Sequence, residues 1–326
     1  MLTGLLKWRY RHSAIGAALI GAAKCAAATS FYFAAHADDI ELFMGRDAGH
    51  DVASGAKVVF VVVTSGSFIR SNGVVAVRGA GVYPGLTPAS KTPYYLTREA
   101  GHFAALADWY KQQYKALGTS IAANVTISGK TVQRTEVGRP GSNVIMYNLR
   151  LVDGDDQDQS GFTWFRKQSL ANPSTRIFAV DGSASYTWAE LKTFVNALIE
   201  REQTSSDTWV NIPEYWEDGV PEVNYDHDDH KTTGRLVSHA LQDYAAASPA
   251  RCIRSIQWVG YATQDKAENY NASDKSLQDE VWTDLNIAKV RTGGPTTLDD
   301  GHARWLHKIY PSANGVGGVT GFGPCP

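Results

Sequence analysis

Two short apolar runs near the start of the chain predict the first strands of a parallel sheet. Residues 30–35 (SFYFAA) and 57–64 (KVVFVVVT) are apolar almost throughout, which is typical of strands buried on both faces. A polar cluster begins at His36, and residues 41–53 are expected to form a helix. A strand, a polar turn, a helix and a second strand together form the opening of a doubly wound α/β fold.

The rest of the chain alternates in the same way. Further strands are expected at residues 143–151, 208–212 and 254–261, and further helices at residues 97–117, 188–203, 233–246 and 275–290. The segment 65–92 and the Gly-rich tail from residue 315 are expected to be loops. Neither a repeat nor a clear linker interrupts the pattern. We therefore predict one α/β domain over residues 29–326, doubly wound and Rossmann-like, with a mostly parallel sheet and helices on both faces.

Composition narrows the class of protein. Of the 326 residues, 43% are hydrophobic and 20% are charged, and the formal net charge is −2. These values describe an ordinary globular protein and argue against a nucleic-acid partner or an anionic-membrane surface. No stretch approaches the roughly 20 apolar residues that a membrane-spanning helix needs. The oligomeric state is not determined by the sequence.

The first 28 residues have the layout of a secretory leader. A basic patch (Lys7, Arg9 and Arg11) precedes a small apolar run at 14–23, and three alanines end at Ala28. We expect export to the periplasm or the exterior, with a retained amphipathic helix in a cytoplasmic protein as the alternative. If the leader is removed, Cys25 goes with it, and Cys252 and Cys325 then either pair as a disulfide or remain free thiols.

Two polar clusters carry the candidate chemistry. His36-x-x-Asp39 follows the first predicted strand, and His227-x-x-His230 follows the strand at 208–212. Imidazole and carboxylate ligands suit zinc, and three protein ligands with one open position are typical of a catalytic zinc site. Taken singly, each cluster is more readily explained as a polar turn or a helix cap. Together they would lie on one rim of the sheet, where ligands bind in such folds.

The two clusters also resemble the signatures of a known family. The stretch AAHADD at 34–39 looks like the AHPDDE motif of the PIG-L/LmbE deacetylases, and DHDDH at 226–230 looks like their second motif. Further resemblances lie at TSG (64–66), LTREAGHFAA (96–105), NLRLVDGD (148–155), DHKTTGRLV (229–237) and RWLHKIY (304–310). The chain departs from the pattern at Ala37, where Pro is usual, and at Ile40, where many members have Glu and this chain has Glu41 one place later.

The resemblance implies a zinc-dependent hydrolase, an amidohydrolase that removes the acetyl group from an N-acetylated sugar such as N-acetylglucosamine or a conjugate of it. Zn²⁺ would be held by His36, Asp39 and His230. Asp38 would act as the general base toward the attacking water. His227, positioned by Asp229, would supply a hydrogen bond or a proton on the side of the leaving amine.

Three other classes of protein are possible for a fold of this kind. A non-catalytic glycan-binding protein on the same fold would need a lost base or ligand, and both are present here. A zinc esterase would share the same machinery. A nucleotide-binding protein of Rossmann type would need a Gly-rich turn after the first strand. This chain instead has two carboxylates there, which would repel a pyrophosphate.

Overall fold

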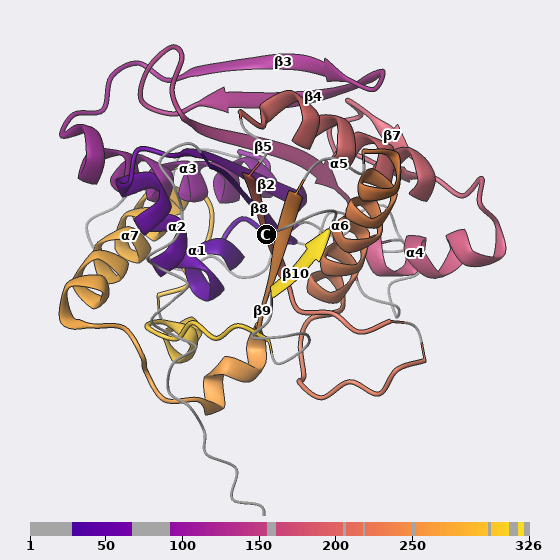
Figure 1. Cartoon of the computed structure of the whole chain (residues 1–326). Coiled ribbons are helices and arrows are strands. Elements are labelled where there is room, and N and C mark those ends of the chain that lie inside the picture. The colour runs from indigo at the N-terminus through magenta and orange to yellow at the C-terminus, as the bar shows by residue number, and fades with distance from the viewer. Residues whose placement is uncertain are drawn as a thin grey trace, which may run out of the picture.

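An eight-stranded sheet forms the centre of the protein (Figure 1). The structure is a computed structural model, which describes residues 28–66, 92–154, 161–204, 207–217, 219–248, 252–298, 301–312 and 319–322. In sheet order the strands are β10 (Val319–Phe322), β9 (Cys252–Trp258), β8 (Asp207–Pro213), β1 (Thr29–Ala34), β2 (Lys57–Thr64), β5 (Val144–Leu151), β4 (Lys130–Glu136) and β3 (Ile121–Ile127). The five strands from β9 to β5 pair in parallel, whereas β10, β4 and β3 pair antiparallel.

Helices cover both faces of this sheet, so the predicted fold class is confirmed. One face carries α1 (Asp39–Phe43), α2 (Gly45–Ala53), α3 (Tyr94–Tyr114) and α7 (Ala272–Arg291). The other carries α4 (Phe162–Ala171), α5 (Trp188–Glu202) and α6 (Asp228–Ala247). Strand β1 supplies both cores, because Phe31 and Phe33 point to the second face while Tyr32 and Ala34 point to the first.

Several elements differ from the sequence prediction. The expected helix at 41–53 is two helices, because the backbone leaves helical geometry at Met44, whose φ is −132°. Helix α6 begins before residue 233, because His227 caps it and brings its start forward. The hairpin of β3 and β4 was missed, since most of β3 is exposed and lacks a buried face. The remaining short elements were also missed: β6 (Ile177–Phe178), β7 (Ser185–Tyr186), α4, β10, and the 3-10 helices η1 (Tyr261–Asp265) and η2 (His302–Trp305).

Some expectations fall on residues that the structure does not describe. The proposed leader, most of the segment 65–92 and Cys325 all lie outside the described residues. Cys252, at the start of β9, is disulfide-bonded and so is not a free thiol. Among the described helices, none has both the length and the apolar character needed to cross a bilayer.

Strand β5 contains a bulge close to its end. The register with β2 runs from Val62 opposite Asn148 to Thr64 opposite Leu151, so β5 has one extra residue there. Arg150, within the bulge, has a φ of +58°, which is unusual for a residue other than glycine. Beyond it the backbone N–H of Ser65 donates to the carbonyl of Leu151 at 2.8 Å. The bulge therefore sets the direction in which the chain leaves the sheet toward Asp153.

The interface between α3 and α7 contains a buried carboxyl group. Asp108 on α3 is 2% exposed and accepts a hydrogen bond from Lys111 Nζ at 2.7 Å. Burial raises the pKa of Asp108 to about 6; Lys111 opposes the shift, and the nearby carboxylate of Asp284 on α7 adds to it. In the unfolded chain the same group has a pKa of about 3.9. Between these two values the folded protein binds a proton that the unfolded chain has lost, so the free energy of unfolding falls as the pH rises.

We expect Asp108→Asn to stabilise the protein at pH 7 by about 1 kcal/mol, because it removes a carboxylate that folding makes harder to ionise. At pH 4 the gain should disappear. Urea unfolding followed by tryptophan fluorescence at both pH values measures the difference. Asp243→Asn is the matched control, because Asp243 pairs with Lys192 at the surface and should change stability little at either pH. A variant less stable than the wild type at pH 7 would show that the ion pair with Lys111 dominates.

Candidate metal centre

Both predicted clusters lie at the carboxyl ends of neighbouring parallel strands. His36 and Asp39 follow β1, and His227 and His230 lie at the start of α6, beyond the end of β8. Strands β1 and β8 pair directly in the sheet, so the two clusters meet. Gly234 brings α6 close to β8, because a Cβ at this position would lie 2.3 Å from the carbonyl oxygen of Pro213. A larger residue there would push the start of α6, with both histidines, away from β1.

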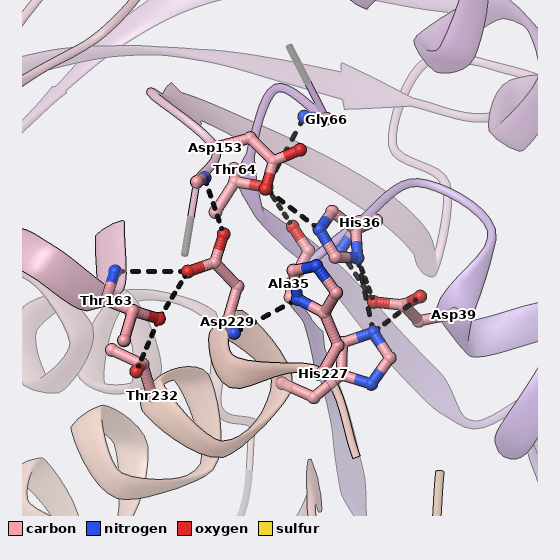
Figure 2. A network of polar contacts seen from close by, with 12 residues as sticks. Ala35, His36, Asp39, Thr64, Gly66, Asp153, Thr163, His227, Asp229 and Thr232 are labelled. Carbon is pink, nitrogen blue, oxygen red and sulfur yellow. Dashed lines mark hydrogen bonds and ion pairs between the residues drawn. The ribbon is translucent and has the colours of Figure 1, made fainter. Parts of the chain in front are cut away.

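The donor groups of three residues from these clusters form a small triangle, to which Asp39 contributes both carboxylate oxygens. His36 Nδ1 lies 3.2 Å from His230 Nε2 and 3.2 Å from Asp39 Oδ2, and His230 Nε2 lies 3.1 Å from Asp39 Oδ1. A tetrahedral zinc ion with bonds of about 2.0–2.1 Å places its ligand atoms about 3.3 Å apart. The triangle therefore has the size of one face of a zinc coordination shell. Figure 2 shows His36 and Asp39 turned toward one another.

The other ring nitrogen of His36 faces a carboxylate. His36 Nε2 lies 3.2 Å from Asp153 Oδ1, beyond the end of β5. A carboxylate at this nitrogen keeps the proton on Nε2 and leaves the lone pair of Nδ1 free, which is the arrangement found for histidines that bind metals. The backbone N–H of His36 also donates to Asp39 Oδ2 at 2.7 Å, and this bond fixes the ligand carboxylate.

His230 is held in the same manner from another side. Its Nδ1 lies 2.7 Å from Asp226 Oδ1, so Nε2 is the nitrogen with a free lone pair. The same Asp226 oxygen accepts hydrogen bonds from the backbone N–H groups of His227 and Tyr261. In each of the two imidazoles, a carboxylate at the second nitrogen therefore orients the ring so that the first nitrogen faces the triangle. Once each ring has lost its second proton, His36 Nδ1 and His230 Nε2 carry the lone pairs that, with Asp39, could hold a divalent cation.

His227 has the tautomer of His36 and not that of His230. It is the N-cap of α6, and its Nδ1 accepts the backbone N–H of Asp229 at 3.1 Å. The proton of the neutral ring is therefore on Nε2, which makes this nitrogen a hydrogen-bond donor. A second group of possible ligands, His36, His227 and Asp229, also lies close together. It suits a metal less well, because His227 Nδ1 and both carboxylate oxygens of Asp229 already accept hydrogen bonds from the protein.

The side chain of Asp229 does not hold His227. Its carboxylate accepts hydrogen bonds from the hydroxyl and N–H groups of Thr163 at 2.7 and 3.1 Å, and from the N–H of Gly154 at 3.1 Å (Figure 2). Burial and the neighbouring Asp153 raise the pKa of Asp229 well above its usual value. Asp229 therefore positions His227 through its backbone, while its side chain fixes the segment after β5 that carries Asp153.

The charges of the cluster also suit a cation. Burial alone would lower the pKa of His36, but Asp39 and Asp153 outweigh it and raise the pKa well above its usual value. His230 shows the same balance, with Asp39 and Asp226 raising its pKa to about 10. Three carboxylates thus surround two imidazoles, which take up protons to balance them. A divalent cation would supply that positive charge and release the protons.

Asp38, next to the triangle in sequence, has a different partner. Its Oδ1 accepts a charge-assisted hydrogen bond from the guanidinium group of Arg98 on α3. Burial would raise the pKa of Asp38, but Arg98 and Lys289 outweigh it and lower the pKa below its usual value. Asp38 is therefore an ionised carboxylate beside the candidate ligands, and Arg98 holds its orientation.

Aromatic rings form one wall beside the donor atoms. The ring of Tyr261 lies 5.1 Å from that of His230 and stacks on Trp305 at 4.6 Å, and Phe43 lies 5.7 Å from His230. Behind the cluster, Glu41 Oε1 lies 2.7 Å from His102 Nδ1, and both side chains are fully buried. Glu41, which stands one residue later than the glutamate of the motif, thus links α1 to α3.

The structure brings into this region all six residues that the sequence predicts for the site: His36, Asp38, Asp39, His227, Asp229 and His230. The sequence prediction assigned no role to Asp153, Asp226 or Arg98. Two signals could have found the first two. Asp153 follows the end of a predicted strand, where ligands gather in this fold. Asp226 is the first residue of the DHDDH motif itself, four residues before His230.

Comparison with known proteins gives the following likenesses. No protein-family model matches the chain, and neither does any curated protein. Among solved structures, it is similar to a deacetylase triple mutant of the teicoplanin biosynthetic pathway, with 12% identity, a TM-score of 0.39 and 81% of each chain covered. It is similar to the N,N'-diacetylchitobiose deacetylase of Pyrococcus horikoshii, with 14% identity, a TM-score of 0.39, and 86% of this chain and 74% of that chain covered.

A solved structure of a protein with a different activity resembles this chain with a comparable identity and TM-score. The 4-carboxy-2-hydroxymuconate hydratase of Pseudomonas putida has 10% identity and a TM-score of 0.37, with 86% of this chain and 82% of that chain covered. Likeness of this degree does not distinguish one activity from another. The assignment therefore depends on the residues of the site.

We expect Asp39→Ala to lower the affinity for zinc by about 100-fold or more, because it removes one of three protein donors. Asp38→Asn should keep zinc, since Asp38 pairs with Arg98 outside the triangle. Elemental analysis after dialysis, together with competition against a chelator, measures both. The two variants control for one another, because they change adjacent buried carboxylates. Loss of zinc from Asp38→Asn with retention by Asp39→Ala would reverse the assignment.

Proposed function

We propose that this protein is a zinc-dependent deacetylase of the PIG-L/LmbE type, which hydrolyses the acetamide of an N-acetylated sugar. The observation that carries the proposal is the triangle of His36, Asp39 and His230, whose donor atoms have the spacing and the tautomers that zinc requires. Three protein donors leave a fourth position for water or substrate. The choice of substrate rests on the sequence motifs, with N-acetylglucosamine or a conjugate of it as the candidate.

In this proposal the residues around the triangle divide the proton transfers. Zinc, when bound, lowers the pKa of a water molecule and polarises the acetyl carbonyl. The ionised carboxylate of Asp38 accepts the proton of the attacking water. Arg98 keeps this carboxylate charged and oriented before the reaction. Asp38 then holds the proton that the leaving amine requires.

His227 has a supporting part in this scheme. Burial, together with the nearby His36 and His230, lowers the pKa of His227 to about 4, so its ring is neutral at pH 7. We infer that Nε2–H of His227 donates a hydrogen bond to the oxygen or nitrogen that gains charge in the transition state. This assigns to His227 the hydrogen-bonding role rather than the donation of a proton.

The proposal is tested by measuring release of free amine and acetate from N-acetylated sugars and their glycosides, with the protein loaded with zinc. We expect turnover of at least one N-acetylglucosamine compound and loss of turnover after chelation. The control is the Asp38→Asn variant, whose rate should fall by roughly 10²- to 10⁴-fold with zinc still bound. Turnover of simple esters alone would favour an esterase on the same fold. Binding of the sugars without turnover would favour a glycan-binding protein.

A second variant separates the two functions of His227. We expect His227→Asn to lower kcat by about 10²-fold while zinc stays bound, because asparagine restores a cap for α6 but lacks the donor Nε2–H. His227→Ala should lose a similar part of the rate and also destabilise the protein by about 1 kcal/mol through the lost cap. Rates, zinc content and urea unfolding are measured in parallel. A zinc-free His227→Asn protein would mean that His227 is itself a ligand.

A further inference from the structure

Arg150 joins strand β5 to helix α3 through a dense set of contacts. Its Nε and one terminal nitrogen donate to the two carboxylate oxygens of Glu99 at 2.6 and 2.7 Å. The other terminal nitrogen donates to Asp181 at 2.7 Å, and the guanidinium group lies 5.2 Å from the centre of the Tyr95 ring. The side chain is 11% exposed, so the paired geometry is largely protected from water.

The backbone of Arg150 is as constrained as its side chain. Its φ of +58° occurs where β5 carries one more residue than β2. Its carbonyl accepts the N–H of Val180 at 2.8 Å, which ties the bulge to the segment after β6. A left-handed conformation at a residue with a long side chain is unfavourable unless the surroundings hold it. The two hydrogen bonds to Glu99 are one such restraint, and those with Asp181 and Val180 are others.

Both elements that Arg150 joins lead directly to the candidate metal centre. On β5, the chain continues from Arg150 to Asp153, whose carboxylate faces His36 Nε2. On α3, Glu99 is adjacent to Arg98, which pairs with Asp38. The first turns of α3 thus carry two neighbouring ion pairs, Glu99 with Arg150 and Arg98 with Asp38. The hydroxyl of Tyr94 also accepts a hydrogen bond from Arg98 at 3.3 Å.

We propose that Arg150 is a positioning residue of the metal centre, which holds Asp153 against His36 and fixes α3 relative to β5. It acts through the bulge and the pair with Glu99, and it touches none of the candidate ligands itself. The inference rests on the proposed function only for the identity of the metal. A purely structural ion pair would contribute to stability and leave His36 unchanged.

The test compares Arg150→Gln and Glu99→Gln with a matched control, Arg134→Gln. Arg134 on β4 pairs with Glu202 at 2.9 Å and Glu136 at 2.6 Å, and its side chain is 18% exposed, so its loss should cost stability without reaching the site. Glu99→Gln keeps the shape of the glutamate and removes its charge. It carries the test if Arg150→Gln fails to fold.

Zinc affinity is the first measurement, by competition with a chelator at fixed pH. We expect Arg150→Gln and Glu99→Gln each to bind zinc about tenfold more weakly, within the range seen when support behind a metal-binding histidine is lost. Arg134→Gln should bind zinc as the wild type does. In an Asp153→Asn background, Arg150→Gln should weaken binding no further, because its effect passes through Asp153. Unchanged affinity in both variants, or full additivity with Asp153→Asn, would overturn the proposal.

The second measurement needs no metal. In the zinc-free protein, the side-chain N–H signal of His36 Nε2 in nitrogen–proton NMR reports its contact with Asp153. We expect this signal to shift or to exchange rapidly in Arg150→Gln and to persist in Arg134→Gln. If the wild type binds no zinc, the proposed function fails, whereas this signal still decides the role of Arg150. Persistence of the wild-type signal in both Arg150→Gln and Glu99→Gln would show that Arg150 does not position Asp153.

Discussion

The parallel pairing of β1 with β8 is the constraint on which the candidate site depends. The chain builds the sheet outward from β1 in both directions, through β2 and β5 on one side and through β8 and β9 on the other. A polar side chain fixes this central pair, because Asn211 on β8 donates to the carbonyl of Phe31 on β1 and accepts from the indole of Trp258 on β9. Loops after β1 and β8 therefore diverge from a common edge, which is where doubly wound folds place their ligands.

From that edge, each candidate ligand is held from two sides. The imidazoles of His36 and His230 face Asp39 with one nitrogen and a supporting carboxylate with the other. The supports come from different parts of the chain, Asp153 after β5 and Asp226 before α6. Ring orientation, tautomer and local charge are thus set by the folded chain itself. A cation entering such a site would meet donors that need little rearrangement, which favours binding.

The sequence predicted the fold class and the main elements because buried parallel strands and amphipathic helices leave strong periodic patterns. Strands β1, β2 and β5 and helices α5 and α7 lie within a few residues of their expected bounds. It did not predict the β3–β4 hairpin, because β3 is an exposed edge strand with mixed side chains. The start of α6 was set too late, since histidine is not a usual cap.

At the site, motif spacing indicated which residues would meet but not how they would be oriented. Asp38 and Asp39 are adjacent in sequence, yet one faces Arg98 and the other faces two imidazoles. The role of the Asp229 backbone toward His227 depends on the cap geometry, and that of Asp153 depends on the path of the chain after β5. These are consequences of tertiary packing, which residue types and spacing do not encode.

The extra residue in β5 also restricts where the chain can tolerate insertions and deletions. Side chains along a strand alternate between faces, so adding or removing one residue reverses the face of everything beyond it. A one-residue deletion between Asn148 and Asp153 would remove the bulge and turn the carboxylate of Asp153 away from His36. Insertions and deletions should therefore be tolerated in the exposed β3–β4 turn at Ser128 and Gly129, and eliminated by selection in the six positions from 148 to 153.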